Sequence, residues 1–548
     1  MNRLRRLTWT AVICGLALSV TACSGNSANS GQQAPTTLQA VMSDESDDLS
    51  PFTPTQQGKT QMFSVINMPA LYVNADSEVT SKMLESWEAS PDATSVTLKL
   101  KPNLKWSDGQ PLTSADVVMS LTAYLDSKIS PNAGRVGAVE GQDALKNGTT
   151  DKLSGVSAPD DTTVQIKLAH PDAAWLAKYA LVGAYWPILP SHVLGQVALK
   201  DLPSNEFFKT WPVSAGPYRL TKFLPGQYTE VERNDNWSLG KANFQKVVFQ
   251  VLSTDQMTAK LQTGEVQYIY TVDPSDVDRV KGMSGVTVAS HQSVAPEVFG
   301  LNNAMPELKD PRIRQAMLYA IDRKGICQTI LGGHCTTPET NLRQIGPSWA
   351  IPTTGLINYD YNPEKAKQLL QEAGWNPDTK LTFLARTQRS YVDKAVTAAV
   401  GQLKAAGFNV EIRNITTAQL LDTIEKKTDW AMFWVSGADF VVDPNEWADY
   451  LKCANRYPNG ANTSQYCNPQ VDALLEQGLR TTDQAERAKY YGQAFTIVNS
   501  DPGEIYLYIV DTIVAFNSHL TGVKPNGNLS GGYWDIGEWS WAAGQGAG

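Results

Sequence analysis

The side chains best suited to chemistry in this sequence are six cysteines and five histidines. The histidines are scattered, and no two have the close spacing that a zinc site needs. The sequence also lacks a G-x-S-x-G elbow, an H-E-x-x-H motif, a phosphate-binding loop and a G-x-G-x-x-G turn. We therefore predict a protein that is not an enzyme and that uses no metal and no cofactor. The histidines are His170, His192, His291, His334 and His519.

The first cysteines belong to the amino-terminal segment, which has the layout of a secretory signal. Three arginines precede an apolar run over residues 7–20, and this run is shorter than the ~20 residues that span a membrane. It leads into VTACS, from Val20 to Ser24, which resembles the bacterial lipobox. We predict that residues 1–22 are a cleaved signal peptide and that Cys23 becomes a lipidated amino terminus.

A flexible polar tether follows over residues 23–35, and the rest of the chain is globular in composition. The net charge is −9, and loss of Arg3, Arg5 and Arg6 with the signal makes it −12. An acidic surface argues against nucleic acid and anionic lipid headgroups as partners. We predict an extracytoplasmic monomer, in the periplasm or on the outer face of the cytoplasmic membrane, that touches the membrane through its lipid anchor only.

Four cysteines remain once Cys14 leaves with the signal and Cys23 takes the lipid. Four cysteines allow three pairings, and the local pairs are the simplest. Zinc is the rival interpretation, but only His334 lies near any of these cysteines, so we predict disulfides. The cysteines are Cys327, Cys335, Cys453 and Cys467, and the local pairs join 327 to 335 and 453 to 467.

The elements that must position these residues alternate between strand and helix. Residues 94–100, TSVTLKL, alternate apolar and polar side chains with the period of a strand. Thr113 stands three residues before Asp116, and this capping-box spacing predicts the start of a helix over residues 114–125.

The second half of the chain repeats this alternation. Two helices are predicted to start on an N-cap followed by proline, at Asp310-Pro311 and at Asn362-Pro363. Short strands at residues 381–384 and 409–413 flank a helix predicted over residues 393–405. The pattern indicates an α/β fold.

From about residue 60 onward, several distinctive segments follow one another in a fixed order, and the most specific is LKPNLKWSDGQPLTSADVVMS at residues 100–120. In this order the segments resemble the peptide/nickel class of ABC-importer solute-binding proteins, family 5. SAGPYRL at residues 214–220 departs slightly, with Ala215 where the family usually has threonine. Within the family, the chain is most similar to dipeptide- and oligopeptide-binding lipoproteins. Further matching segments are Leu84–Glu88, Ile188–His192, Leu301–Asn303 and Asp310–Asp322.

The resemblance implies a two-lobed periplasmic-binding-protein fold, hinged and of the type II or cluster C kind. Lobe I would hold residues 36–295, including an extra subdomain over roughly 80–205. Lobe II would hold residues 296–514, and residues 515–548 would return to lobe I.

The resemblance also assigns the two ends of a peptide ligand to lobe II. In the family's peptide binders an acid takes the amino group, a role that carries over to Asp439. An arginine takes the carboxylate, a role that carries over to Arg389, because a guanidinium meets a carboxylate with two parallel hydrogen bonds.

Two further residues are candidates for contact with the ligand. Asp443 is a rival acid, because the family's acid–proline pair lies one residue closer to the first acid than it does here. Trp434 is a candidate wall for the ligand's side chains. A disulfide loop from Cys453 to Cys467 would also resemble the dipeptide binders.

These roles imply a receptor that captures di- to oligopeptides by hinge closure and delivers them to an ABC permease with its ATPase subunits. One alternative keeps the fold but binds a nickel chelate, an opine, haem or an oligosaccharide, although a neutral sugar needs neither Asp439 nor Arg389. Another alternative is a secreted hydrolase or a sensor, and a hydrolase would turn peptides over where a binder returns them unchanged.

Overall fold

The structure is a computed structural model, and it describes most of the chain after the tether. The described residues are 36–43, 47–293, 295–342, 349–352, 354–386, 390–426, 429–436, 442–525 and 532–544. The predicted signal peptide, Cys23 and the tether lie outside them.

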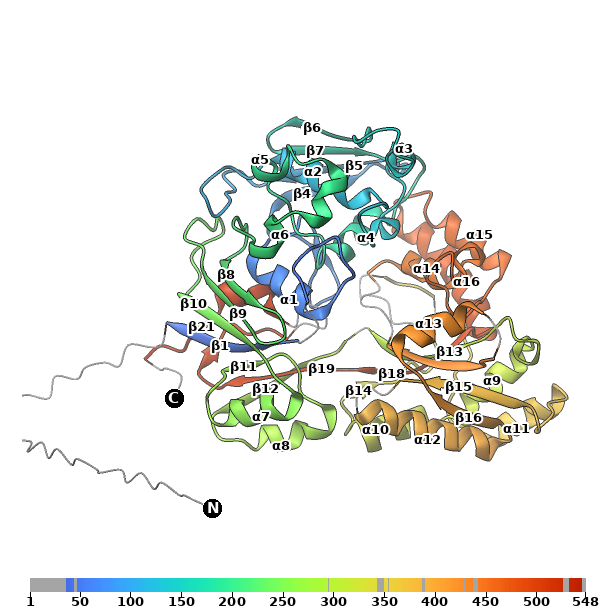
Figure 1. The fold of residues 1–548 in the computed structure, drawn as a ribbon. Helices are drawn as coiled ribbons and strands as arrows, with labels where there is room; N and C mark the ends of the chain where they lie inside the picture. The colour runs from blue at the N-terminus through green and yellow to red at the C-terminus, as the bar shows by residue number, and fades with distance from the viewer. Residues whose placement is uncertain are drawn as a thin grey trace, which may run out of the picture. The chain divides into compact units, whose positions relative to one another are not determined.

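The described residues include a seven-stranded sheet with the order β12-β19-β11-β1-β10-β9-β8. Its first strand, β1, lies between two parallel neighbours, β10 and β11, and the other pairs are antiparallel. Helices α7 and α8 pack beside β11, β12 and β19 (Figure 1). The elements are β1 Thr37–Met42, β8 Tyr218–Leu224, β9 Tyr228–Arg233, β10 Lys246–Val251, α7 Thr254–Gln262, β11 Tyr268–Ile269, α8 Val277–Lys281, β12 Val286–His291 and β19 Thr512–Asn517.

A four-stranded antiparallel sheet, β4-β5-β7-β6, lies in the region predicted as the extra subdomain. Helix α2 packs against β6 and β7 (Figure 1). The strands are β4 Leu84–Ala89, β5 Ser95–Leu100, β6 Val156–Asp160 and β7 Thr163–Lys167. The helices of this half are α1 Gln57–Ile66, α2 Ser114–Leu125, α3 Gln142–Lys146, α4 Trp175–Val182, α5 Ser191–Leu194 and α6 Phe207–Thr210.

A six-stranded sheet has the order β14-β18-β13-β17-β15-β16. Helices α10 and α12 pack against it, and α9 and α11 pack against α12 (Figure 1). The strands are β13 Pro296–Leu301, β14 Cys335–Thr336, β15 Lys380–Ala385, β16 Asn409–Asn414, β17 Met432–Ser436 and β18 Glu504–Val510. The helices are α9 Pro311–Ala320, α10 Arg323–Ile330, α11 Pro363–Glu372, α12 Ser390–Ala406, α13 Thr417–Glu425, α14 Ala448–Leu451, α15 Pro469–Gln477 and α16 Gln484–Ser500.

The chain passes between the two large sheets twice. The first passage runs from β12 to β13, and the second runs from β18 through Asp511 to β19. The boundary predicted between residues 514 and 515 therefore falls inside β19, because β19 already pairs with β12 from Thr512 onward.

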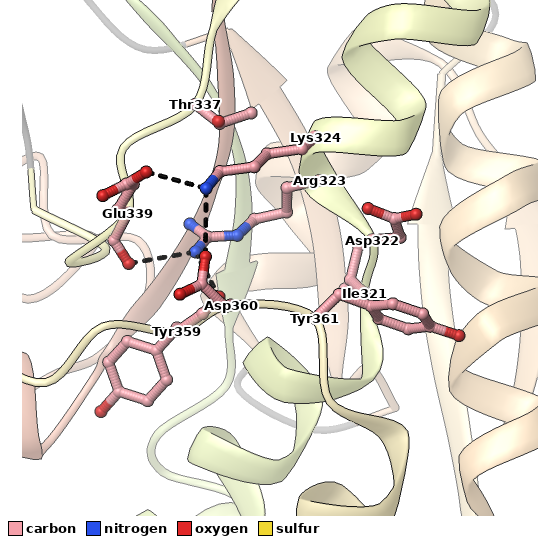
Figure 2. Close-up of a pocket in the computed structure, with 9 residues that line it drawn as sticks. All are labelled: Ile321, Asp322, Arg323, Lys324, Thr337, Glu339, Tyr359, Asp360 and Tyr361. Carbon is pink, nitrogen blue, oxygen red and sulfur yellow. Dashed lines mark hydrogen bonds and ion pairs between the residues drawn. The ribbon is translucent and has the colours of Figure 1, made fainter.

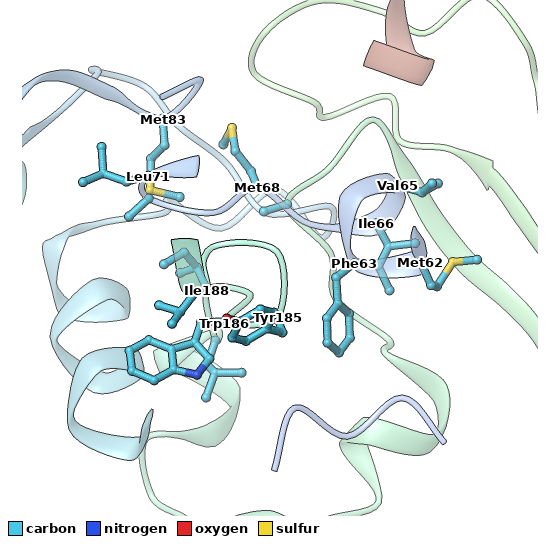
Figure 3. Packing of buried hydrophobic residues seen from close by; sticks show 14 of the residues in the cluster. Met62, Phe63, Val65, Ile66, Met68, Leu71, Met83, Tyr185, Trp186 and Ile188 are labelled. Carbon is cyan, nitrogen blue, oxygen red and sulfur yellow. The ribbon is translucent and has the colours of Figure 1, made fainter. Parts of the chain in front are cut away.

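Separate apolar cores support the two large sheets. In the first, side chains of α1 meet the segments around Leu71 and Trp186 (Figure 3). Trp186 also stacks on Tyr124 of α2, with ring centroids 5.1 Å apart. In the second, Phe299 and Phe383 of the six-stranded sheet meet edge-on at 4.7 Å under α12. Each sheet buries its own apolar face, so each supplies its own hydrophobic stabilisation.

The predicted elements are confirmed with small changes in their ends. The predicted strand at 94–100 is β5, and α2 starts on the predicted capping box, in which Thr113 N donates to Asp116 Oδ2 at 2.7 Å. Asp310 and Asn362 cap α9 and α11 with their side-chain oxygens. The helix predicted over residues 393–405 begins earlier, at Ser390, as α12.

Candidate functional site

The carboxyl ends of two neighbouring parallel strands mark one edge of the six-stranded sheet. β15 and β17 run parallel, with Phe383 opposite Met432 and Leu384 opposite Phe433. In open α/β sheets, ligands bind in the crevice outside such strand ends. Helix α12 starts at Ser390, shortly after β15 ends, which makes this edge the candidate ligand site.

A buried carboxylate, Glu297, lies at the same edge. β13 runs antiparallel to β17, so the start of β13 lies beside the end of β17, and Glu297 pairs in register with Ser436 and Tyr508. Glu297 is only 5% exposed, and Ser436 Oγ donates a hydrogen bond to its Oε1 at 3.4 Å. Glu297 is not among the residues predicted from the sequence, although an acid near the start of the apolar strand PEVFGL is an unusual feature.

Arg386 follows β15 and brings a positive charge to this edge. Its guanidinium carbon lies 5.5 Å from the centroid of the Trp434 ring, a cation–π distance. Burial lowers the pKa of Arg386, and the nearby charge of Glu297 opposes that shift. The hydroxyl of Tyr508 and the indole N–H of Trp434 are buried here without hydrogen-bond partners among the described residues. This edge of the six-stranded sheet therefore carries both charged and polar side chains.

A cavity of about 500 Å³ lies against the start of α12. Ser390 and Tyr391 form one wall, and Val510 and Asp511 form another. The remaining lining comes from residues 270–276 after β11, from the start of α7, and from Ser43 and Gln57. This volume is within the ~300–1,000 Å³ typical of small-molecule sites. The cavity therefore lies between residues next to the seven-stranded sheet and the candidate-site edge of the six-stranded sheet.

Comparison with known families gives one match that spans most of the chain. Residues 78–458 match the model of the bacterial extracellular solute-binding proteins, family 5. The chain belongs to this family. Family 5 is a class of transport solute-binding proteins that act outside the cytoplasm, as the resemblance implied.

Individual relatives are similar over more than three quarters of the chain. The oligopeptide-binding protein AppA of Bacillus subtilis is 26% identical over 444 residues, which cover 78% of this chain and 77% of AppA. The crystal structure of AppA with a nonapeptide has a TM-score of 0.76 at 21% identity, and covers 93% of this chain and 99% of that one. The substrate-binding protein CtaP of Listeria monocytogenes has a TM-score of 0.80 at 23% identity, and covers 93% and 100%. The predicted two-lobed fold is confirmed.

The two residues predicted to hold the ends of the ligand, Arg389 and Asp439, lie outside the described residues. In the sequence, each comes shortly after one of the two parallel strands, Arg389 after β15 and Asp439 after β17. Trp434 is described, and its ring is 3% exposed within the apolar core of the six-stranded sheet. Its ring lies against the guanidinium of Arg386 and offers little exposed surface to a ligand.

Asp443, the rival acid, is bound within the protein. Its two carboxylate oxygens accept from the two Nη atoms of Arg487 at 2.8 and 2.9 Å, and both side chains are nearly fully buried. Asp443 also accepts from the backbone N–H of Asn445 at 2.8 Å, as an N-cap. Arg487 lies over the ring of Trp349 at 4.9 Å. These contacts use both oxygens, so Asp443 acts as a structural acid.

Both local disulfide pairs are confirmed. Cys327 is bonded to Cys335 and Cys453 is bonded to Cys467. The second closes the loop that follows α14, beside α15, where Asp472 accepts from the backbone of Cys453 at 3.2 Å. The disulfide and this hydrogen bond together fix the loop between α14 and α15.

A smaller pocket beside α10 is an ion-pair network. Lys324 lies between Glu339 at 2.8 Å and Asp360 at 3.1 Å (Figure 2). The buried guanidinium of Arg323 donates to backbone carbonyls, including those of Tyr359 and Tyr506 at 2.9 Å. The pocket has a volume of only about 40 Å³, so these residues hold three chain segments together and leave no room for a ligand.

In the described part of the chain, no helix is both long enough and apolar enough to cross a membrane.

Proposed function

We propose that the mature chain captures short peptides outside the cytoplasmic membrane and delivers them to the permease of an ABC importer. The observation that carries the proposal is the shared edge of β15 and β17, each of which leads into a residue of the charge that one end of a peptide needs. The names of AppA and its structure with a nonapeptide support a peptide as the ligand class.

In this proposal, Asp439 receives the amino group of the peptide and Arg389 receives its carboxylate. Charge-assisted hydrogen bonds contribute ~1.5–3 kcal/mol each, while micromolar affinity needs about 8 kcal/mol. The two ends are therefore insufficient, and main-chain pairing with the extended peptide supplies part of the remainder. Burial of the ligand on lobe closure supplies the rest.

We further propose that residues 36–295 and the chain from the start of β19 onward form lobe I, that residues 296–510 form lobe II, and that the two passages between the sheets form the hinge. Away from the hinge, Ala173 N donates to Leu479 O at 3.0 Å and Thr482 Oγ1 donates to Pro91 O at 3.3 Å. These bonds join the four-stranded sheet region to the α15–α16 loop, as closure requires. The peptide would favour the closed form, and the closed form would dock on the permease.

The proposal places a lipid on Cys23 and a single protomer on each anchor. The partners are a short peptide, the permease and its ATPase subunits, and ATP is hydrolysed by those subunits. The protein itself needs no cofactor and returns the peptide unchanged, so it is proposed not to be an enzyme.

The test is native mass spectrometry of the chain without residues 1–23, purified from a host grown on rich medium. We expect a spread of di- to pentapeptide masses on the protein, and loss of these masses in Asp439→Asn. Asp429→Asn is the matched control, because Asp429 precedes β17 and pairs with Arg413 at 2.7 Å. A single non-peptide mass, or peptides retained in Asp439→Asn, would overturn the assignment of the ligand or of its amine partner.

A further inference from the structure

The cavity against the start of α12 carries an excess of negative charge. Its described lining contains four aspartates, and no lysine, arginine or histidine is among the residues described there. The aspartates are Asp255, Asp273, Asp276 and Asp511.

Three of the four aspartates interact with a neighbouring cation or hydrogen-bond donor. Asp276 pairs with Arg279 at 2.7 Å, and Asp255 adds to the field on the same guanidinium. Asp273 accepts from the backbone N–H and the hydroxyl of Ser275 at 2.9 and 2.6 Å. These three acids therefore already serve the local fold.

Asp511 is different, because its carboxylate has no hydrogen bond or ion pair among the described residues. Only its backbone N–H is engaged, with the carbonyl of His334 at 3.1 Å. Burial raises the pKa of Asp511, and His334 and His291 oppose that shift. His291 Nε2 lies 2.6 Å from the carbonyl oxygen of Ala75. A half-buried carboxylate thus lines a cavity of ligand size, and no cationic side chain is among the described residues of that lining.

The position of the cavity identifies the end of the peptide that would reach it. Ser390 and Tyr391, which form its wall at α12, follow directly after Arg389, the proposed partner of the ligand's carboxylate. The last side chain of a peptide branches from the carbon that bears this carboxylate. We infer that the cavity receives the side chain of the carboxyl-terminal residue and selects lysine or arginine there, with Asp511 as the counter-charge.

This inference rests on the proposed function and adds the substrate class to it. A basic side chain at the carboxyl terminus would neutralise Asp511, whereas an acidic one would meet repulsion. A basic residue at the amino terminus would lie at the far end of the peptide and gain little. The expected gain is about tenfold or more in affinity, as for one partly desolvated charge-assisted contact.

Isothermal titration calorimetry with tripeptides tests the inference. The chain without residues 1–23 is first freed of bound peptide by unfolding and refolding with its disulfides intact. Ala-Ala-Lys and Lys-Ala-Ala have equal charge and composition, so they separate position from net attraction. We expect Ala-Ala-Lys to bind about tenfold more tightly than Lys-Ala-Ala and Ala-Ala-Ala, and Ala-Ala-Glu to bind most weakly.

Variants identify the acid. Asp511→Asn should bring the four tripeptides close to equal affinity, and Asp511→Lys should reverse the order in favour of Ala-Ala-Glu. Asp278→Asn makes the same charge change on α8, outside the lining of the cavity, and should keep the wild-type order. Equal binding of Ala-Ala-Lys and Lys-Ala-Ala, or an unchanged preference in both Asp511 variants, would overturn the inference while leaving peptide capture intact. Failure of every tripeptide to bind would instead overturn the proposed function, and this inference with it.

Discussion

At the scale of single residues, Asp443 shows how an acid that looks suited to a ligand can belong to the framework. It caps the short 3-10 helix Pro444–Trp447 and forms a two-point ion pair with Arg487 of α16. Burial alone would lower the pKa of Arg487, but Asp443 and Tyr491 raise it above its usual value. The pair is therefore charged and ties the start of this 3-10 helix to α16.

Arg487→Met should destabilise the protein by ~3–5 kcal/mol, because it leaves the carboxylate of Asp443 buried without its partner. The double variant Asp443→Leu/Arg487→Met should recover most of this loss, since an apolar pair of similar volume avoids burying a charge. Urea unfolding followed by tryptophan fluorescence measures both. Equal losses in the single and double variants would show that the ion pair is not the source of the effect.

At the scale of elements, the 3-10 helix after Asp443 depends on a second acid. Glu446 Oε1 accepts from the backbone N–H of Asp443 at 3.1 Å, which completes a capping box. Burial raises the pKa of Glu446 well above the ordinary 4.5, and the negative charges of Asp443 and Asp449 raise it further. The folded state therefore holds this proton more tightly than the unfolded chain does.

The stability of the folded protein should therefore depend on pH through Glu446. The stability from the raised pKa is fully present below about pH 4.5, the unfolded value, and is lost as the pH rises through the higher folded value. Glu446→Gln keeps the cap acceptor and cannot ionise. We expect the Tm of this variant to exceed the wild-type Tm at pH 8 by more than at pH 5, as measured by calorimetry. A constant difference across that range would contradict the assignment of this proton to Glu446.

At the scale of the whole molecule, two chain passages connect the two large sheets, and the residues proposed to hold the two ends of the ligand both follow strands of the six-stranded sheet. In the proposed function, the six-stranded sheet would therefore bind first and the seven-stranded sheet would close afterwards. Asp511 lies on one passage and in the wall of the 500 Å³ cavity, so binding there would act directly on the hinge.

The proposed lipid anchor also belongs to the scale of the whole molecule. Cys23→Ser should abolish labelling with radioactive palmitate and move the protein from the membrane fraction to the soluble fraction, because the acyl chains supply the membrane affinity. Cys14→Ser, inside the predicted signal, is the matched control and should leave labelling unchanged. Retention of the Cys23→Ser protein in washed membranes would contradict the anchor.

Local features could be predicted from the sequence because they depend on residues that are close together in the chain. The strand at 95–100, the capped starts of α2, α9 and α11, and the local disulfides all follow from periodicity, caps and short loops. The family resemblance added the two-lobed fold and the roles predicted for Arg389 and Asp439.

Tertiary structure alone decided which charges meet. Asp443 and Arg487 are 44 residues apart, and Glu297 and Ser436 are 139 residues apart, so no local pattern signals either contact. The cavity at Asp511 likewise exists only because two sheets, α12 and the loop after β11 come together. Periodicity and caps act within a few residues, whereas the pairing of buried charges is set by packing over the whole chain.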